Sequence, residues 1–202
     1  MNDDTIMKKA SYVWDIASLA LKDLINKIDT DSFLKCVKKI AGCKGRIITS
    51  GSGTSGAAAK KISHSLSCIE RPSFFLSPSD AVHGALGSVQ KNDIAILISK
   101  GGNTTEIINM IPSLKKKEIF IIGVTENKKS ILASKSDLLL KIMVDKEADD
   151  FNMLATTSTM AVVAVFDAVC ICLMKYMDYS KEKFAIIHPK GAVGERLQKE
   201  KY

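Results

Sequence analysis

The chain has 202 residues, of which 46% are hydrophobic and 25% are charged, and its formal net charge is +7. This length and composition are typical of one soluble α/β domain with a single substantial core. The basic residues are spread along the chain, and the aromatic residues, only 6% of the total, are not interleaved with them as in a base-stacking surface. We therefore expect no nucleic-acid partner and a basic surface that attracts anionic metabolites.

Neither the cysteines nor the apolar segments indicate an exported or membrane protein. The five cysteines are an odd number without the paired spacing of a zinc site, which is typical of reduced, mostly buried thiols in a cytoplasmic protein. Met1–Thr5 has no basic segment followed by an apolar one, so no signal peptide is expected. The longest apolar run, Met160–Met174, contains Asp167 and is shorter than a bilayer span of about 20 residues. It predicts a buried core helix and no membrane partner.

In chain order, the hydrophobic periodicity predicts helices first and then an alternating pattern. Apolar residues spaced by three and four predict a long helix over Ile6–Ile28, and a second helix follows over Ser32–Ala41. The predicted strands are Ile47–Thr49, Ser73–Leu76, Ile94–Ser99, Ile119–Thr125 and Leu138–Val144. The helices between them are Ala57–Cys68, Thr105–Lys116 and Ser130–Ser134, with a turn over Ser79–Gly87. This alternation predicts a five-stranded parallel sheet covered on both faces, a three-layer α/β/α sandwich whose ligands bind beyond the carboxyl ends of the strands.

The loop after the first predicted strand reads SGSGTSGAAA and leads into a helix. Its glycines permit positive φ angles, and the helix presents unpaired N–H groups and the positive end of its dipole. The spacing Gly51-x-Gly53-x-x-Gly56 matches a dinucleotide fingerprint, but the next strand, Ser73–Leu76, does not end in the acidic residue that this fingerprint needs. No Gly-Lys-Ser/Thr closes the loop as in a nucleotide P-loop. The loop predicts a site for a small phosphorylated or hydroxylated ligand, with an ordinary strand-to-helix turn as the alternative. The candidate residues are Ser52, Gly53, Thr54 and Ser55.

The loop after the third predicted strand has the same chemistry. Glycines and hydroxyls precede a helix, and successive N–H groups in such a loop can form an anion-binding nest. Two such loops at neighbouring carboxyl ends predict a two-sided phosphate cradle. Glu106, in the first turn of the helix, either interacts with the helix dipole or takes part in catalysis. The candidate residues of this loop are Ser99, Lys100, Gly101, Gly102, Asn103 and Thr104.

Further candidates lie beyond the fifth predicted strand and in two glycine-containing loops. Glu147 follows that strand, and Thr156 and Thr157 open the long apolar helix, with Thr156 as its expected N-cap. His83 and His188 precede or lie near glycines, where an imidazole is expected to face a pocket. Because histidine exchanges protons near neutral pH, each is a candidate acid or base, with a structural role as the alternative.

Together these motifs resemble a sugar isomerase (SIS) domain from about Ile6 to Leu197, in particular the arabinose-5-phosphate isomerase group. The motifs are Ser-Gly-Thr-Ser-Gly, Ser-x-x-Gly-x-Thr-x-Glu, Ala-Val-His-Gly-Ala-Leu-Gly, Lys-Glu-Ala, Thr-Thr-Ser-Thr and His-Pro-x-Gly-Ala-Val-Gly. The resemblance implies a flavodoxin-like SIS fold, a dimer or tetramer with shared active sites, and aldose–ketose isomerisation of a phosphosugar without metal or nucleotide cofactor. Residues 1–202 are then one SIS domain: N-terminal helices over 5–41, sheet and helices over 46–177, and a C-terminal active-site segment over 180–202.

The resemblance also implies roles for individual residues. Ser55, Ser99, Thr104 and the adjoining backbone would hold the phosphate. Glu147 would be the base that moves a proton between C1 and C2 through a cis-enediol, and His188 would open the sugar ring, although the reverse assignment is an alternative. The groups expected around the reacting end of the sugar are His83, Glu106, Glu147 and His188.

The chain departs from the arabinose-5-phosphate isomerase pattern at three places. The group has a lysine where this chain has Thr54, an aspartate where it has Ala85, and Ser-Asn-Ser-Gly where it has Ser99-Lys100-Gly101-Gly102. Lys100 is expected to restore positive charge near the phosphate. The 202 residues also lack the CBS modules common in the group, so we expect no regulation through them. The alternatives are a non-catalytic sugar-phosphate sensor and a hexulose-phosphate isomerase.

Overall fold

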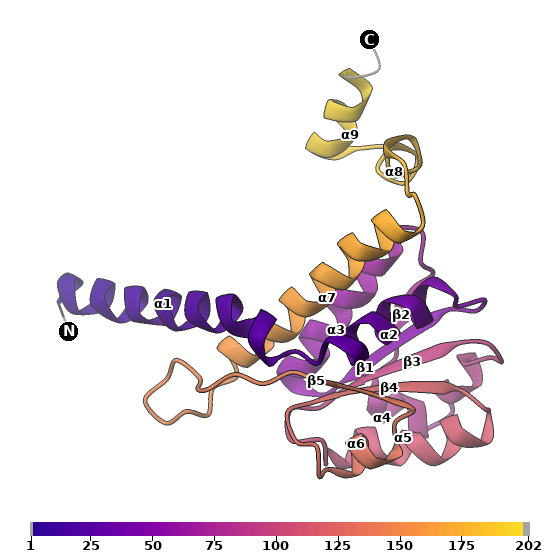
Figure 1. Cartoon of the computed structure of the whole chain (residues 1–202), viewed down its shortest axis with the longest axis horizontal. Helices are drawn as coiled ribbons and strands as arrows, with labels where there is room; N and C mark the ends of the chain where they lie inside the picture. The colour runs from indigo at the N-terminus through magenta and orange to yellow at the C-terminus, as the bar shows by residue number, and fades with distance from the viewer. Residues whose placement is uncertain (1, 200–202) are drawn as a thin grey trace.

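The computed structural model describes residues 2–199 and confirms the predicted α/β class. Five parallel strands form one sheet in the order β2-β1-β3-β4-β5 (Figure 1). The strands are β1 (Ile47–Gly51), β2 (Ser73–Phe75), β3 (Ile94–Ile98), β4 (Phe120–Thr125) and β5 (Leu138–Lys141). The order reverses between β1 and β3, which is the place where ligands bind in such sheets.

Burial follows the position of each strand in the sheet. Every residue of the central strands β1 and β3 is buried, whereas the edge strand β2 is half-exposed. Ile47 pairs with Ile94, and Gly51 pairs with Ile98, so β1 and β3 end at the same level. The loops that follow these strands therefore emerge side by side at one edge of the sheet, as the sequence predicts.

Helices cover both faces of the sheet (Figure 1). One face packs against α2 (Thr30–Ala41), α3 (Gly53–Ser67) and α7 (Thr157–Tyr176), and its core includes Ile47, Ile96 and Phe166. The other face packs against α4 (Pro78–Val82), the 3₁₀ helix η1 (Ala85–Ser88), α5 (Thr105–Lys116) and α6 (Ile131–Lys135), around residues such as Ile48 and Leu97. Successive strand residues point to opposite faces, so each strand contributes to both cores.

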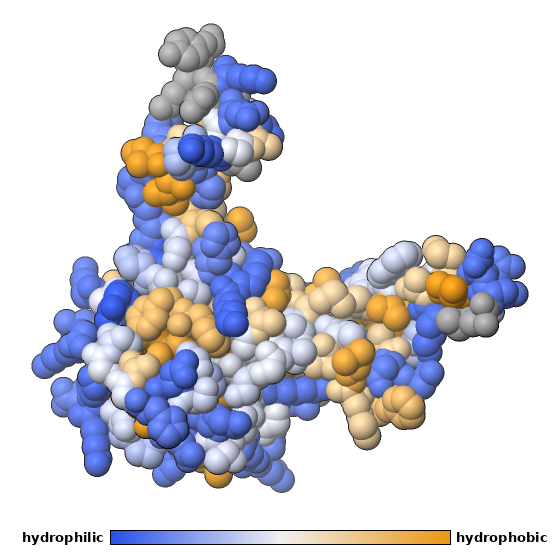
Figure 2. Space-filling view, turned by 180° about the vertical axis from the view of Figure 1, so that it is seen from behind, coloured by the Kyte–Doolittle hydropathy of each residue, from blue (hydrophilic) through white to orange (hydrophobic). Residues whose placement is uncertain are grey.

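Three helices extend away from this body. The long α1 (Asp3–Lys27) projects to one side, and α8 (Lys181–Ile187) and α9 (Gly191–Lys199) lie beyond the far end of α7 (Figure 1). Figure 2 shows hydrophobic side chains on both projections. The Trp14 side chain on α1 is 63% exposed and Ile25 is 79% exposed. These apolar surfaces have no cover within the described chain.

The first glycine-rich segment differs from its prediction. It was expected as a loop, but α3 begins at Gly53 rather than at Ala57. A Cβ atom on Gly51 would lie 2.6 Å from the Ser55 carbonyl, and one on Gly56 would lie 2.6 Å from the Gly51 carbonyl. These two glycines therefore allow the first turn of α3 to pack directly on the end of β1, so the helix starts four residues earlier.

The ends of other helices and strands also differ from their predictions. The fifth strand ends at Lys141 rather than Val144, and the predicted turn over Ser79–Gly87 overlaps α4 and η1. Residues 181–199 form two short helices where the sequence predicted only a segment. The last three residues of that segment, 200–202, lie outside the described residues.

The apolar run that was predicted to be a buried core helix is buried on one face only. Val165, Phe166 and Val169 of α7 are buried, but the Ile171 side chain is 65% exposed. By length and composition alone α7 could cross a membrane. Core helices of soluble proteins have the same composition, and the packing of α7 on α1, α2 and α3 fits that role.

The cysteines were expected to be mostly buried, and three of them are. All five are free thiols, with Cys36, Cys43 and Cys170 buried, Cys68 half-buried and Cys172 exposed. Cys172 was expected inside a buried helix and instead lies on the open face of α7.

Candidate active site

Of the helices that begin at the carboxyl edge of the sheet, α3, α5 and α7 have no capping hydrogen bond from the side chain of their own N-cap residue, and among the described residues only α7 receives a replacement from another side chain. Ser52 precedes α3 and Thr104 precedes α5, and neither makes a side-chain capping hydrogen bond to a described residue. By contrast, α1, α2, α4, α6 and α8 each have a side-chain cap. The first N–H groups of a helix have no intrahelical partner, so α3 and α5 leave positive ends open to an anion.

The loop after β3 is held in place by its own side chains. The Ser99 and Thr104 hydroxyl oxygens lie 2.8 Å apart, and the Gly102 N–H donates to Ser99 Oγ at 3.0 Å. Gly102 has a φ of +73°, and a Cβ atom there would lie 2.1 Å from Ser130 Oγ. Asn103 accepts a hydrogen bond from the Ile131 N–H at 2.9 Å, so its side chain fixes the loop to α6. Gly101 is exposed.

Glu147 closes the N-terminus of α7. Its Oε2 accepts hydrogen bonds from the Thr156 N–H at 3.0 Å and the Ser158 N–H at 3.1 Å, and its Oε1 accepts one from the Ser158 hydroxyl. Thr156 occupies the expected N-cap position, but its side chain does not cap the helix. The Thr157 hydroxyl is buried and has no hydrogen-bond partner within residues 2–199.

Lys100 forms an ion pair with the same carboxylate. Its Nζ lies 2.7 Å from Glu147 Oε1, and the Glu147 side chain is 0% exposed while that of Lys100 is 39% exposed. Burial raises the pKa of Glu147, but hydrogen bonds from Lys100, Ser158 and Thr156 outweigh it and lower the pKa from 4.5 to about 2. In this conformation Glu147 is therefore a fully ionised, well-satisfied carboxylate and a weak base.

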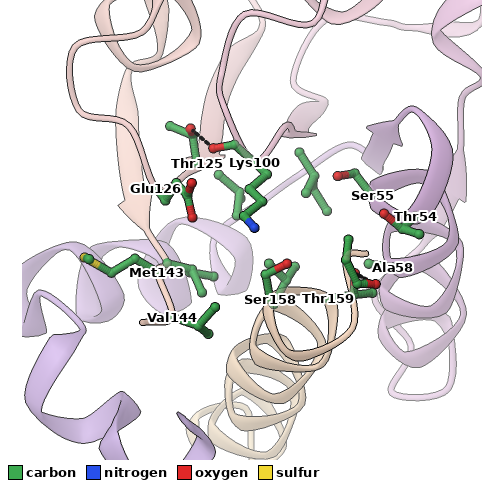
Figure 3. Close-up of a pocket in the computed structure, with 15 residues that line it drawn as sticks. Thr54, Ser55, Ala58, Lys100, Thr125, Glu126, Met143, Val144, Ser158 and Thr159 are labelled. Atoms are coloured by element: carbon green, nitrogen blue, oxygen red, sulfur yellow. Dashed lines mark hydrogen bonds between the residues drawn. The ribbon is translucent and has the colours of Figure 1, made fainter. Parts of the chain in front are cut away.

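Lys100 lies across a small hollow between these elements (Figure 3). Thr54 and Ser55 at the start of α3 form one wall, Glu126 after β4 stands opposite, and Ser158 lies toward the end of the lysine side chain. The hollow encloses ≈ 40 Å³, which holds only a few water molecules. It thus places a cation, hydroxyls and an open helix N-terminus together, but it is too small for a sugar while Lys100 occupies it.

A second hollow lies on the other side of the first glycine-rich segment. It has a volume of ≈ 450 Å³ and is lined by residues from the ends of β1 and β2 and the start of α5. Glu106 is exposed there, in the first turn of α5 as predicted. The other polar residues on its walls are Ser52, Lys60, Ser77 and Ser79.

The two candidate histidines are not brought to either hollow. His83 is exposed at the end of α4, after the edge strand. His188 ends α8, where its ring stacks on Phe184 with centroids 3.9 Å apart. Glu147 adjoins the beginning of α7 and His188 follows its end, and a 20-residue helix is about 30 Å long. One chain therefore cannot place Glu147 and His188 around one small molecule in this conformation.

Sequence reasoning missed several residues of the site. Ser158 donates twice to Glu147, Asn152 accepts from the Glu147 N–H at 2.6 Å, and Thr125 donates to the Lys100 carbonyl at 2.7 Å. Thr125 ends the fourth strand and Glu126 follows it, so inspecting every strand end would have found them. Among residues 2–199, no group of three His, Cys, Asp or Glu side chains is arranged to hold a metal ion.

This fold and site define a class of protein. The SIS domain family matches residues 39–171, and the chain belongs to that family of sugar isomerase domains. Its structure is similar to that of a proposed sugar-phosphate isomerase from Listeria monocytogenes, with a TM-score of 0.93, 53% identity, and coverage of 94% of this chain and 100% of that one.

Two further relatives concern one sugar phosphate. A protein of E. coli CFT073 was solved in complex with arabinose 5-phosphate; its TM-score is 0.89 at 33% identity, covering 94% of this chain and 100% of that chain. The arabinose 5-phosphate isomerase KdsD of Francisella tularensis is 40% identical over 180 residues, which are 88% of this chain and 55% of KdsD. The chain spans about half the length of the curated relatives that it matches.

Proposed function

We propose that the protein is a phosphosugar aldose–ketose isomerase that interconverts ribulose 5-phosphate and arabinose 5-phosphate or a closely related pair. The observation that carries this proposal is the pair of uncapped N-termini of α3 and α5, beside a cation and a buried carboxylate. The helix ends suit a phosphate, and the carboxylate suits proton transfer. The names of the relatives supply the choice of sugar, since KdsD is an arabinose 5-phosphate isomerase and the E. coli protein was solved with arabinose 5-phosphate bound.

The phosphate would bind in the first hollow, between the N-terminus of α3 and the loop that leads from β3 into α5. Ser52, Gly53, Thr54 and Ser55 would contribute hydroxyls and N–H groups from α3. The loop after β3 would contribute Ser99, Thr104 and its backbone, with the Lys100 ammonium as the counter-ion. Thr156 and Thr157, at the start of α7, would lie toward the sugar.

The chemistry would proceed through a cis-enediol. In the open-chain aldose, Glu147 removes the C2 proton, the electron pair of that C–H bond forms the C1=C2 double bond, and the carbonyl oxygen takes up a proton. The O2 hydroxyl then loses its proton, its electrons form the C2 carbonyl, and C1 receives the proton carried by Glu147. Nothing is gained or lost overall, and a positioned base of this kind contributes roughly 10²–10⁴-fold.

A second copy of the chain would complete the site. His188 would open the sugar ring, and His83 and Glu106 would contact the reacting end, but His188 is separated from Glu147 of its own chain by the whole of α7. The exposed apolar residues of α1 support a dimer or tetramer that brings these groups together. The free state of all five cysteines supports a reducing, cytoplasmic compartment.

A specific observation favours a second candidate function. The carboxylate of Glu147 is buried, ion-paired and held by the amides of α7, as a purely structural carboxylate would be. A non-catalytic sugar-phosphate sensor with the same fold would need the open helix ends but no base. The two functions differ in turnover and not in binding.

Incubation with a panel of pentose and hexose phosphates in deuterated water, followed by NMR, tests the proposal. An isomerase incorporates deuterium at the carbon next to the carbonyl, while a sensor binds without exchange. Conversion of hexulose phosphates but not pentose phosphates would transfer the assignment to a hexulose-phosphate isomerase.

Subunit mixing tests the shared site. Glu147→Gln and His188→Ala variants are each expected to be inactive, and mixed oligomers are expected to regain activity because some sites contain both intact residues. A monomeric mass by light scattering at micromolar concentration would contradict both the oligomer and the shared site.

A further inference from the structure

The Lys100–Glu147 ion pair joins one buried partner to one accessible partner. The Glu147 side chain is 0% exposed and receives donors from Thr156 and Ser158, so its position is fixed by the start of α7. The Lys100 side chain is 39% exposed, and its ammonium makes no other hydrogen bond within residues 2–199. An ammonium has three donors, so two remain for a ligand.

The backbone of Lys100 is fixed even though its side chain is accessible. The Lys100 carbonyl accepts hydrogen bonds from the Thr125 hydroxyl at 2.7 Å and from the Glu126 N–H at 3.1 Å. Movement is therefore confined to the flexible four-carbon stem. Lys100 is anchored at the edge of the sheet and its charged end is free to exchange partners.

One wall of the hollow that Lys100 crosses is the uncapped N-terminus of α3, which can bind an anion. Thr54 and Ser55 lie there in the first turn of α3, whose N-terminus has no side-chain cap among the described residues (Figure 3). Because the hollow encloses only ≈ 40 Å³ in this conformation, a phosphosugar cannot occupy it unless Lys100 moves. The helix end would attract the phosphate, and the phosphate would attract the ammonium.

Departure of Lys100 would change the base strength of Glu147. Lys100 is the only cation that lines the hollow within the described chain, and the other ionisable residue on its walls is Glu126. The neighbouring groups from α3 and α7 are the neutral hydroxyls of Thr54, Ser55, Ser158 and Thr159. Without Lys100, burial raises the pKa of Glu147 against the remaining hydrogen bonds from Ser158 and Thr156. The negative charge of the bound phosphate raises it further, toward the range of a useful base.

We propose that a phosphate entering this hollow draws the Lys100 ammonium away from Glu147, so that substrate binding itself frees the carboxylate to act as the base. Lys100 is then a positioning residue with two partners, Glu147 in the empty site and phosphate in the filled one. This inference rests on the proposed function. It reconciles a carboxylate that is satisfied in the empty protein with a role in proton transfer.

The test follows the Glu147 carboxyl directly. The full-length protein is labelled with ¹³C at glutamate carboxyl carbons, and the Glu147 signal is assigned by its absence in Glu147→Gln. The probe is a pentitol 5-phosphate, which has no carbonyl group and cannot isomerise. Without the probe, the signal is expected to stay that of a carboxylate down to about pH 4; with saturating probe, its midpoint is expected to rise by at least about two pH units, so that protonation becomes visible above pH 4.

Two variants sharpen the result. In Lys100→Met the midpoint is expected to be raised already and to respond little to the probe, and KM for the pentose phosphate is expected to rise about tenfold or more, because a charged phosphate contact is lost. The matched control is Lys61→Met, which removes the ion pair of α3 with Asp167 of α7, away from the hollow. It is expected to behave like the parent in both measurements.

The outcomes separate the two proposals. A parent protein that isomerises pentose phosphates, but whose Glu147 signal does not respond to bound pentitol phosphate, overturns the ion-pair exchange and leaves the isomerase intact. A signal that shifts on binding in a protein without turnover supports the exchange and overturns the isomerase. If the pentitol phosphate does not bind at all, both proposals are wrong.

Discussion

The N-termini of α3 and α7 lie close together at one edge of the sheet, but a carboxylate of the chain caps only the N-terminus of α7. At α7, the carboxylate of Glu147 accepts from the Thr156 and Ser158 amides, so the chain supplies its own anion. At α3, Ser52 has the extended backbone of an N-cap but makes no capping hydrogen bond to a described side chain. Both helices pack on the same face of the sheet and face the same hollow.

The difference identifies which end is left for a ligand. A helix N-terminus carries about half a positive charge, and an anion placed there is stabilised whether it comes from the chain or from solution. The filled end of α7 contributes to stability in the absence of any ligand. The open end of α3 gives up that contribution and leaves its positive charge available to an anion from solution.

Removing the anion at α7 is expected to have the largest effect. Glu147→Gln keeps the size of the side chain but cannot accept the C2 proton, so turnover should fall by roughly 10²–10⁴-fold while phosphosugar binding stays within a few-fold. Turnover, a binding isotherm and a thermal melt on one preparation measure this. Near-normal turnover in a folded variant would shift the proton transfer to His188 or Glu106.

Ser158→Ala is the matched control for that experiment. It removes one hydrogen bond to the carboxylate and leaves the carboxylate itself in place. We expect a lower melting temperature and a much smaller loss of turnover than in Glu147→Gln. Equal losses in the two variants would indicate that Glu147 acts through the geometry of α7 alone.

The Glu147 carboxylate at the N-terminus of α7 should also determine how the stability of the protein changes in acid. The pKa of Glu147 is 4.5 in its ordinary state and about 2 in the folded protein. A lowered pKa means that the stabilisation is complete above about pH 4.5 and is lost as the pH falls toward 2, by roughly 3 kcal/mol in the free energy of unfolding. Denaturant unfolding at a series of pH values should show this loss in the parent and a flatter profile in Glu147→Gln.

A second acid serves as the reference for the acid profile. Asp149 also has a lowered pKa, through hydrogen bonds from the Leu154, Met153 and Phe151 N–H groups that outweigh its desolvation, but it lies in an exposed loop. Asp149→Asn is expected to leave most of the acid-dependent loss in place. If it flattened the profile as much as Glu147→Gln, the loss would not belong to the end of α7.

Two hydroxyl groups of the loop between β3 and α5, which the proposal places against the phosphate, can be removed by substitution. Ser99→Ala combined with Thr104→Ala should weaken phosphosugar binding about a hundredfold or more, because each hydroxyl lost from a charged phosphate costs about 1.5–3 kcal/mol. Calorimetry measures the affinity, with Ser134→Ala on α6 as a control that removes one exposed hydroxyl elsewhere. Unchanged affinity would mean that the phosphate lies in the other hollow, beside Glu106.

The smallest effect is expected when the N-terminus of α3 is given a carboxylate cap like that of α7. Ser52→Asp adds an anion at the N-cap, which should raise the free energy of unfolding by about 0.5 kcal/mol and weaken phosphosugar binding about tenfold. Ser52→Asn supplies a cap without the charge and should affect binding less. Tighter binding in Ser52→Asp would contradict the assignment of this end to phosphate.

The fold was predictable because its signals are local. The helix over Thr105–Lys116 was predicted with both ends correct, and the five strands were all found. The start of α3 was wrong because glycines were taken as loop residues, whereas Gly51 and Gly56 allow a contact between β1 and α3 that only the folded chain reveals. Tertiary packing, and not the local propensity of glycine for loops, therefore determines where α3 begins.

The site was predictable in its parts but not in its pairing. The glycine-rich segments and Glu147 could be picked out because each follows a strand. The partner of Glu147 could not, because Lys100 is 47 residues away in the chain and meets it only when β3 and the start of α7 reach the same edge. His188 was predicted from its glycine-containing loop, and only the structure shows that the length of α7 separates it from Glu147.

Glu147 binds the N-terminus of α7 and Lys100 in the empty protein and, in the proposed reaction, also acts on the sugar. Substitutions there are expected to lower stability, so selection for folding would disfavour them even in a relative that had lost all turnover. A mutational scan that measures only expression would therefore find Glu147 sensitive to substitution, as would a scan that measures activity. Invariance at this position cannot distinguish an enzyme of this family from a binding protein. Ser52, whose side chain makes no capping hydrogen bond to a described residue, is expected to vary more once no phosphate has to be held.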